Sequence, residues 1–112
     1  MLQIIGTLGC TQTRKAVRFC QERSVAFQFV DLKARSLSEG EWKKIFAALD
    51  ADSLIDTSST YYKKNGYQWR EFDPIEELKE HPQLLKTPLL KRGHRVLAHF
   101  DEAFILAKDS LA

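Results

Sequence analysis

The chain has 112 residues, of which 44% are hydrophobic and 29% charged, and its formal net charge is +2. These values fit one soluble globular domain, spanning residues 1–112, that buries a core without disulfide or metal staples. The small charge argues against direct nucleic-acid binding, and the lack of an apolar run of about 18 residues argues against a membrane span.

The chain begins with a short apolar segment, residues 2–7, that predicts a buried strand. Gly6 and Gly9 flank the following turn, Cys10 comes next, and helical periodicity covers residues 11–23. At a helix start, unpaired N–H groups and the helix dipole favour thiolate over thiol, and Arg14 adds positive charge. The alternative is a cysteine that only packs, since free cysteines are often buried. The strand, turn, cysteine and helix order favours a functional thiol.

The second cysteine, Cys20, falls on the apolar side of the same expected helix and is therefore predicted to be core. Ten residues of one helix separate it from Cys10 by about 15 Å, beyond the reach of a disulfide. The two cysteines have neither metal-ligand nor CxxC spacing, so no metal centre is expected. Few cysteines and no signal peptide indicate a reducing, cytoplasmic compartment.

Residues 25–31 alternate apolar with small or polar side chains and predict a second strand, parallel to the first. Ser38 and Glu41 form a capping box at the start of a second helix. Its apolar stripe consists of Trp42, Ile45, Phe46 and Leu49. No element is expected over residues 50–59.

Residues 60–69 carry four aromatic rings around Asn65 and Gly66, which fits either a helix ending at Gly66 or an aromatic connection. We expect the rings to cover the core rather than bind a ligand. Asp73 and Pro74 predict a short helix that Pro82 interrupts, with Ile75, Leu78 and His81 on one face.

The C-terminal part predicts a hairpin and a last helix. A strand opens over residues 87–90, a turn covers 92–95, and a partner strand covers 96–100. Asp101 then caps a helix whose apolar contacts are Ala103, Phe104, Leu106 and Ala107. The order is β-α-β-α, helical insertions, then β-β-α.

Three segments in this order carry a family resemblance: residues 10–16 (CTQTRKA), 86–90 (KTPLL) and 96–104 (VLAHFDEAF). They are similar to the CxxCRKA or CxxSR, KRPxx and VLVGFDEEAF segments of the arsenate reductase (ArsC) family, with its Spx and YffB branches. The resemblance implies an α/β, thioredoxin-like fold with a mixed central sheet flanked by helices and a helical insertion over about residues 38–86.

The resemblance also implies the roles of the site residues. Cys10 is the nucleophile, and the bond before Pro88 is cis, which brings the backbone of Thr87 against the sulfur. The backbone amides of Thr11, Gln12 and Thr13 line an anion pocket, and Arg14 lowers the pKa of the thiol. Thr13 replaces the second cysteine of a CxxC pair, where its hydroxyl can hydrogen-bond the thiolate.

Departures from the family pattern limit the chemistry. Arsenate-reducing members hold the oxyanion with arginines, whose places fall here on Thr87, on residues 56–58 and near His99. None of these side chains supplies a permanently charged, bidentate donor, so arsenate reduction is disfavoured.

The resemblance leads to three functional hypotheses. The first is a thiol oxidoreductase in which Cys10 alone forms mixed disulfides with glutathione or protein thiols, with glutathione as co-substrate and no bound cofactor. The second is an Spx-like regulatory protein that binds RNA polymerase without turnover. The third is an arsenate reductase with relocated arginines, such as Arg70, Arg92 or Arg95.

Overall fold

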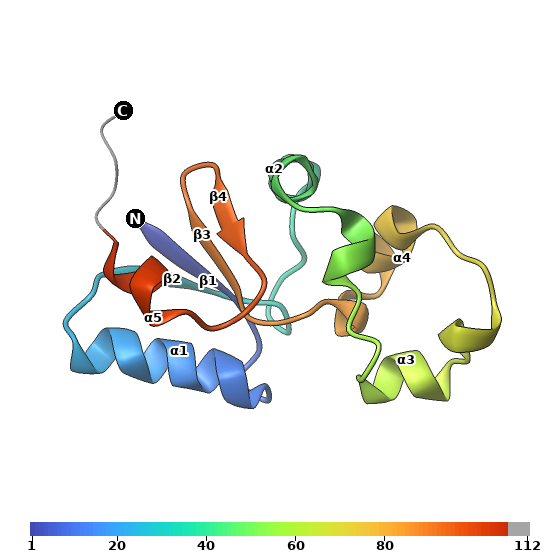
Figure 1. Ribbon diagram of the computed structural model, residues 1–112, viewed down its shortest axis with the longest axis horizontal. Helices are drawn as coiled ribbons and strands as arrows, with labels where there is room; N and C mark the ends of the chain where they lie inside the picture. Colours follow the sequence, from blue (N-terminus) through green and yellow to red (C-terminus); the bar gives the residue numbers. More distant parts are fainter. Residues whose placement is uncertain (108–112) are drawn as a thin grey trace. The chain divides into compact units, whose positions relative to one another are not determined.

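A four-stranded mixed sheet organises the first of two units into which the chain divides (Figure 1). The computed structural model describes residues 1–107. One unit comprises Met1–Arg35 and the segment that begins at Thr87, and the other comprises Ser36–Lys86. The insertion that the family resemblance implies, over about residues 38–86, falls within the second unit.

The N-terminal strand β1 (Leu2–Gly6) is an inner strand of this sheet, whose order is β2-β1-β3-β4. It pairs in parallel with β2 (Phe27–Asp31) and antiparallel with β3 (Leu89–Arg92). The last strand, β4 (Arg95–Leu97), pairs antiparallel with β3. The parallel pairing of the first two strands is as predicted, because the helix between them carries the chain back to the same edge.

Helices α1 (Thr11–Glu22) and α5 (Glu102–Leu106) share one core with the sheet. Figure 1 shows both helices beside the strands of this unit. Cys20 is fully buried there, as the sequence predicted, and full burial of a leucine, isoleucine or phenylalanine contributes about 1.5–3 kcal/mol. The buried residues of this core are Leu2, Ile4, Ala16, Cys20, Leu90, Phe104 and Ile105.

The second unit contains helices α2 (Glu39–Ala48), α3 (Thr60–Lys64) and α4 (Pro74–Glu80). The predicted capping box is present: Glu41 N–H donates to Ser38 Oγ at 3.1 Å and Ser38 N–H to Glu41 Oε1 at 2.9 Å. Short 3-10 turns lie at Ala51–Leu54, Tyr67–Trp69 and Pro82–Leu84. An isolated bridge between Ile55 and Leu85 joins two of these turns.

Several local expectations for the second unit need revision. The stretch without an expected element contains the Ala51–Leu54 turn, because Leu54 is buried. Of the two alternatives for residues 60–69, the structure has the helix that ends at Gly66: α3 stops at Lys64, and Gly66, with a φ of 69°, begins a separate turn. Among the aromatic residues Tyr67 is buried as expected, but Trp69 is 85% exposed. Of the face expected for the helix after Asp73, Leu78 is buried, whereas Ile75 is exposed.

The second strand of the C-terminal hairpin, β4, ends earlier than expected. Its strands extend to Arg92 and Arg95, so the turn consists of Gly93 and His94, and β4 already ends at Leu97. Asp101 caps α5 as predicted, its carboxylate accepting the Phe104 N–H at 2.8 Å.

The apolar face of the last helix differs from the sequence expectation. Ile105 is fully buried, whereas Ala103 and Leu106 are exposed. A one-turn helix offers too few positions for periodicity to identify its buried face.

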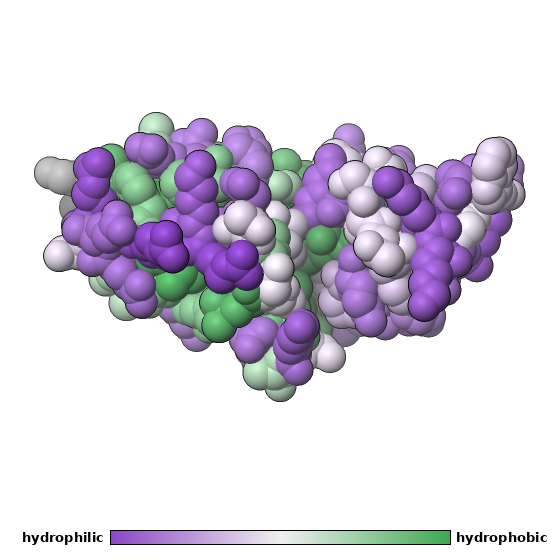
Figure 2. Space-filling view, turned by 90° about the horizontal axis from the view of Figure 1, so that it is seen from below, coloured by the Kyte–Doolittle hydropathy of each residue, from purple (hydrophilic) through white to green (hydrophobic). Residues whose placement is uncertain are grey.

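The surface is mostly hydrophilic on the face that Figure 2 shows, where purple side chains separate smaller green areas. Within residues 1–107, no helix combines the length and the apolar character needed to cross a bilayer.

Gly6, the last residue of β1, packs directly against Thr13 of α1. A methyl group on Gly6 would stand 2.5 Å from Thr13 Oγ1 and 3.0 Å from Thr13 Cγ2. Threonine is branched at Cβ and stiff at χ1, so its side chain cannot swing aside freely. The absence of a side chain at Gly6 therefore sets how closely the first turn of α1 approaches the sheet.

We predict that Gly6→Ala lowers the free energy of unfolding by about 1–3 kcal/mol, because the added methyl overpacks the contact with Thr13. Urea denaturation followed by circular dichroism measures the change. Gly40→Ala in α2 is the control, since its nearest neighbour there is Ser38 Oγ at 3.9 Å and alanine favours a helix. Equal stability of Gly6→Ala and the wild type would contradict the prediction.

Candidate functional site

Cys10 is the N-cap residue of α1, at the end of a tight turn that follows β1. Its N–H donates to the Thr7 carbonyl at 3.0 Å, and its own carbonyl accepts the Arg14 N–H at 3.1 Å. Serine or aspartate often occupies this position because the side chain can accept N–H groups of the first helical turn. Cys10 is partly exposed, so its sulfur combines an N-cap position with access from solvent.

The environment of Cys10 favours the thiolate. Burial of the sulfur raises the pKa of the thiol, but nearby donors that can stabilise the thiolate, on the side chains of Thr13 and Thr87 and the backbone of Thr13 and Gln12, outweigh it. The net pKa of Cys10 lies below the 9.0 of an unperturbed thiol. The backbone N–H donors are those of the second and third helical residues, as expected for an N-cap acceptor.

Thr13 is the buried partner of the sulfur. Its side chain is 0% exposed, and within residues 1–107 its Oγ1 has no hydrogen-bond partner of good geometry. A buried hydroxyl left without a partner costs about 1–3 kcal/mol. We interpret Thr13 as a donor that acquires its acceptor when Cys10 ionises, which reconciles the unpaired hydroxyl with its effect on the Cys10 pKa.

Thr87 and Pro88 lie against the sulfur, although they are far from Cys10 in the sequence. The bond between them is cis, as the family resemblance implied. The Cys10 thiol donates to the Thr87 carbonyl oxygen at 3.5 Å, a contact that favours the protonated form. The Thr87 side chain acts in the opposite direction and lowers the pKa.

Arg14 contacts the turn before Cys10. Its Nη1 donates to the Leu8 carbonyl at 2.7 Å, and its Nη2 to Thr11 Oγ1 at 3.4 Å. The groups that lower the Cys10 pKa are those of Thr13, Thr87 and Gln12. Arg14 therefore holds the shape of the turn, a contribution that the sequence did not indicate.

Two further residues at this site were missed by sequence reasoning. Gly6 sets the position of Thr13, and Lys33 places its Nζ 3.8 Å from where a Cβ on Gly9 would stand. The sequence contained an indication that Lys33 lies near the site, because Lys33 follows β2, the strand parallel to β1. The carboxyl ends of parallel strands meet at one edge of a sheet, where ligands commonly bind.

Cys20 does not belong to the site. Both cysteines are free, and burial raises the pKa of Cys20, with a smaller opposing effect from Arg92. Cys20 is therefore a poor nucleophile, and Cys10 is the accessible thiol.

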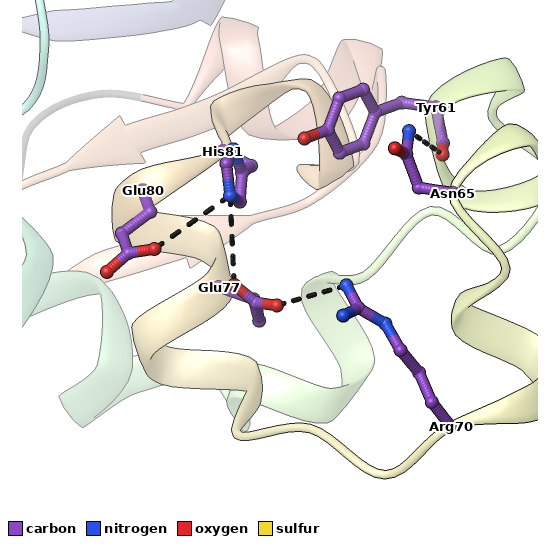
Figure 3. Close-up of polar contacts among 6 residues, drawn as sticks. All are labelled: Tyr61, Asn65, Arg70, Glu77, Glu80 and His81. Atoms are coloured by element: carbon purple, nitrogen blue, oxygen red, sulfur yellow. Dashed lines mark hydrogen bonds and ion pairs between the residues drawn. The ribbon is translucent and has the colours of Figure 1, made fainter.

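A second polar cluster lies in the Ser36–Lys86 unit (Figure 3). Glu77 lies between Arg70 and His81, at 3.2 Å from the guanidinium and 3.9 Å from His81 Nε2, while Glu80 is 3.8 Å from the same nitrogen. The sequence analysis did not identify this grouping, although the i, i+3 and i+4 spacing of Glu77, Glu80 and His81 indicates it. Arg70 already engages Glu77, and we assign no ion to the cluster.

Comparison with known proteins agrees with this geometry. The sequence model described as "ArsC family" matches residues 6–107. The chain belongs to the ArsC family. It is 27% identical over 107 residues to the global transcriptional regulator Spx of Enterococcus faecalis, covering 91% of this chain and 81% of that protein.

Solved structures show the same thioredoxin-like fold. The YffB protein superposes with a TM-score of 0.78 at 25% identity, covering 90% of this chain and 92% of that one. An arsenate reductase from Vibrio cholerae gives a TM-score of 0.69 at 16% identity, covering 85% and 86%. The mixed sheet and flanking helices of this ArsC-family protein are therefore shared with both.

We predict that Thr13→Val raises the pKa of Cys10, because valine keeps the shape of threonine and removes the hydroxyl donor. The rate of alkylation by iodoacetamide, measured against pH, reports the shift as slower reaction at neutral pH. Thr11→Val is the control, since the Thr11 side chain does not lower the Cys10 pKa. An unchanged pKa in Thr13→Val would refute the role of the hydroxyl.

The same variant carries a stability prediction whose sign follows from linkage. In the wild type the folded-state pKa of Cys10 is depressed, so ionisation stabilises the fold at high pH, and this contribution is lost as pH falls through the folded pKa. In Thr13→Val the pKa of Cys10 is depressed less, so ionisation of the thiol contributes less stability at high pH. At acidic pH, where the thiol is protonated, we expect Thr13→Val to be at least as stable as the wild type, since it lacks an unpaired buried hydroxyl. Urea denaturation of both proteins at acidic pH and at a pH above the Cys10 pKa measures the difference in their free energies of unfolding.

Proposed function

We propose that this ArsC-family protein is a thiol–disulfide oxidoreductase in which Cys10 is the single nucleophile and glutathione is the co-substrate. The observation that carries the proposal is the setting of Cys10. It is a partly exposed N-cap thiol with a lowered pKa, and a buried threonine stands where a resolving cysteine would be. The other cysteine is buried, so resolution requires an outside thiol.

The reaction balances in two exchange steps. The Cys10 thiolate attacks one sulfur of a disulfide R–S–S–R′, a bond forms between Cys10 and RS, and R′S⁻ leaves with the electron pair and takes a proton from water. A glutathione thiolate then attacks the RS sulfur of the mixed disulfide. This step releases the Cys10 thiolate and gives the disulfide of R and glutathione.

The surrounding residues have separate roles in this scheme. The Thr13 hydroxyl and the N–H groups of Gln12 and Thr13 stabilise the thiolate both before attack and when it leaves. The Thr87 backbone, against the sulfur, aligns the chain of the partner. Arg14 and Thr11 keep the turn that presents Cys10.

A second candidate function is regulation without turnover through a protein partner such as RNA polymerase. The 27% identity to Spx, a global transcriptional regulator, favours it. Affinity capture from lysate with wild type and Cys10→Ser separates the two functions. RNA polymerase recovered equally by both proteins supports regulation, whereas mixed disulfides recovered only by the wild type support exchange chemistry.

Arsenate reduction, the third hypothesis, receives little support from the arginines. Arg70 is paired with Glu77, and Arg92 donates to the carbonyls of Phe104 and Ile105 at the end of α5. Arg95 lies over the Phe104 ring at 5.1 Å. These three side chains are engaged in structural contacts. Arsenate-dependent consumption of glutathione is the direct assay.

We predict that Cys10→Ser reduces glutathione-dependent reduction of bis(2-hydroxyethyl) disulfide to the uncatalysed background, because serine is not ionised at neutral pH. Cys20→Ala serves as the control and should keep the activity, since Cys20 is buried. Mass spectrometry of trapped protein should find the mixed disulfide on Cys10 alone. Full activity in Cys10→Ser would refute the proposed function.

A further inference from the structure

We propose that Lys33 makes the Cys10 site selective for thiols and disulfides that carry a carboxylate near the sulfur. This inference rests on the proposed function, since it names the substrate class of the same thiol. The carboxylate can belong to glutathione or to an acidic residue beside a protein cysteine. Both sources present the same group to the Lys33 ammonium.

The backbone of Lys33 is held at the edge of the sheet where Cys10 lies. Gly6 and Asp31 form the last pair of the parallel ladder, and the Leu32 N–H continues it to the Gly6 carbonyl at 2.9 Å. Beyond that point, Asp31 organises a turn: Oδ1 accepts the Lys33 N–H at 2.9 Å, and its carbonyl accepts the Ala34 N–H at 3.0 Å. The starting point of the Lys33 side chain is therefore fixed.

The Lys33 ammonium lies beside Gly9. Lys33 Nζ lies 3.8 Å from the position that a Cβ on Gly9 would take, and Gly9 directly precedes Cys10. Lys33 is exposed, and within residues 1–107 its ammonium forms no ion pair.

A second cation, Arg14, also contacts the turn. The Arg14 guanidinium lies on the Leu8 carbonyl, and the first turn of α1 contains no acidic residue. The Asp31 carboxylate accepts the Lys33 N–H at 2.9 Å. Two cations therefore contact the turn that precedes Cys10, one at Leu8 and one at Gly9.

The test uses three small symmetric disulfides that differ in charge: 3,3′-dithiodipropionate, bis(2-hydroxyethyl) disulfide and cystamine. Rates of mixed-disulfide formation at Cys10 are measured in single turnover and divided by the rates with a free thiol, which removes intrinsic reactivity. We expect the wild type to prefer the dicarboxylate. Lys33→Gln should lower that rate about two- to fivefold and leave the neutral disulfide unchanged.

Charge reversal and a matched control make the test specific. Lys33→Glu should favour cystamine over the dicarboxylate, and added salt should weaken both preferences. Lys15→Gln removes the same charge from α1, where the ammonium lies over the Phe100 ring at 5.0 Å, and should keep the wild-type order. The Cys10 pKa is measured in every variant, because an effect through the thiolate would change all three rates together.

The outcomes separate the two proposals. Equal rate changes with all three disulfides in Lys33→Gln, or a wild type without charge preference, overturn the Lys33 inference and leave the proposed function standing. A Cys10 that reacts with none of them overturns the proposed function itself. Glutathione disulfide and disulfides of short cysteine peptides flanked by aspartate are then compared, and a Lys33-dependent preference with either identifies the source of the carboxylate.

Discussion

The close packing of α1 against the end of β1 is the constraint on which the site depends. Gly6 has no side chain, so Thr13 of α1 can lie directly against the end of β1. Cys10 is the N-cap of the same helix, one turn before Thr13. This contact fixes the first turn of α1, whose Gln12 and Thr13 backbone groups lower the Cys10 pKa. Strand β2 ends beside the end of β1 and leads into the turn that contains Lys33. Strand β3 begins at the same end, directly after Thr87 and Pro88.

The thiolate is stabilised by hydrogen bonds more than by neighbouring charge. Burial of the sulfur acts against ionisation, and the donors from Thr13, Thr87 and Gln12 reverse it. Because the Thr13 hydroxyl is unpaired in the thiol form, ionisation of Cys10 relieves a buried polar group as well as creating a charge. Such an arrangement keeps the sulfur reactive without a formal cation in contact with it.

The proteins that this chain resembles have names that point to different roles, from arsenate reductase to transcriptional regulator. The shared fold therefore leaves the chemistry to the side chains around the thiol. Arg70, Arg92 and Arg95, the arginines considered for oxyanion binding, contact a carboxylate, backbone carbonyls and an aromatic ring, respectively. Thr13 stands in place of a second cysteine. Both features favour exchange with an outside thiol.

The amino-acid sequence determined the elements with strong local signals. The Ser38 capping box, the N-cap position of Cys10 and the parallel first two strands follow from contacts between residues near in sequence or from a short crossover. Short elements were less predictable, because Ile105 and Leu97 lie in segments too brief for periodicity. Only the tertiary structure decided that Gly6 supports Thr13 and that Lys33 reaches Gly9. Those contacts join residues from different elements, and strand pairing and helix packing, rather than local sequence, bring them together.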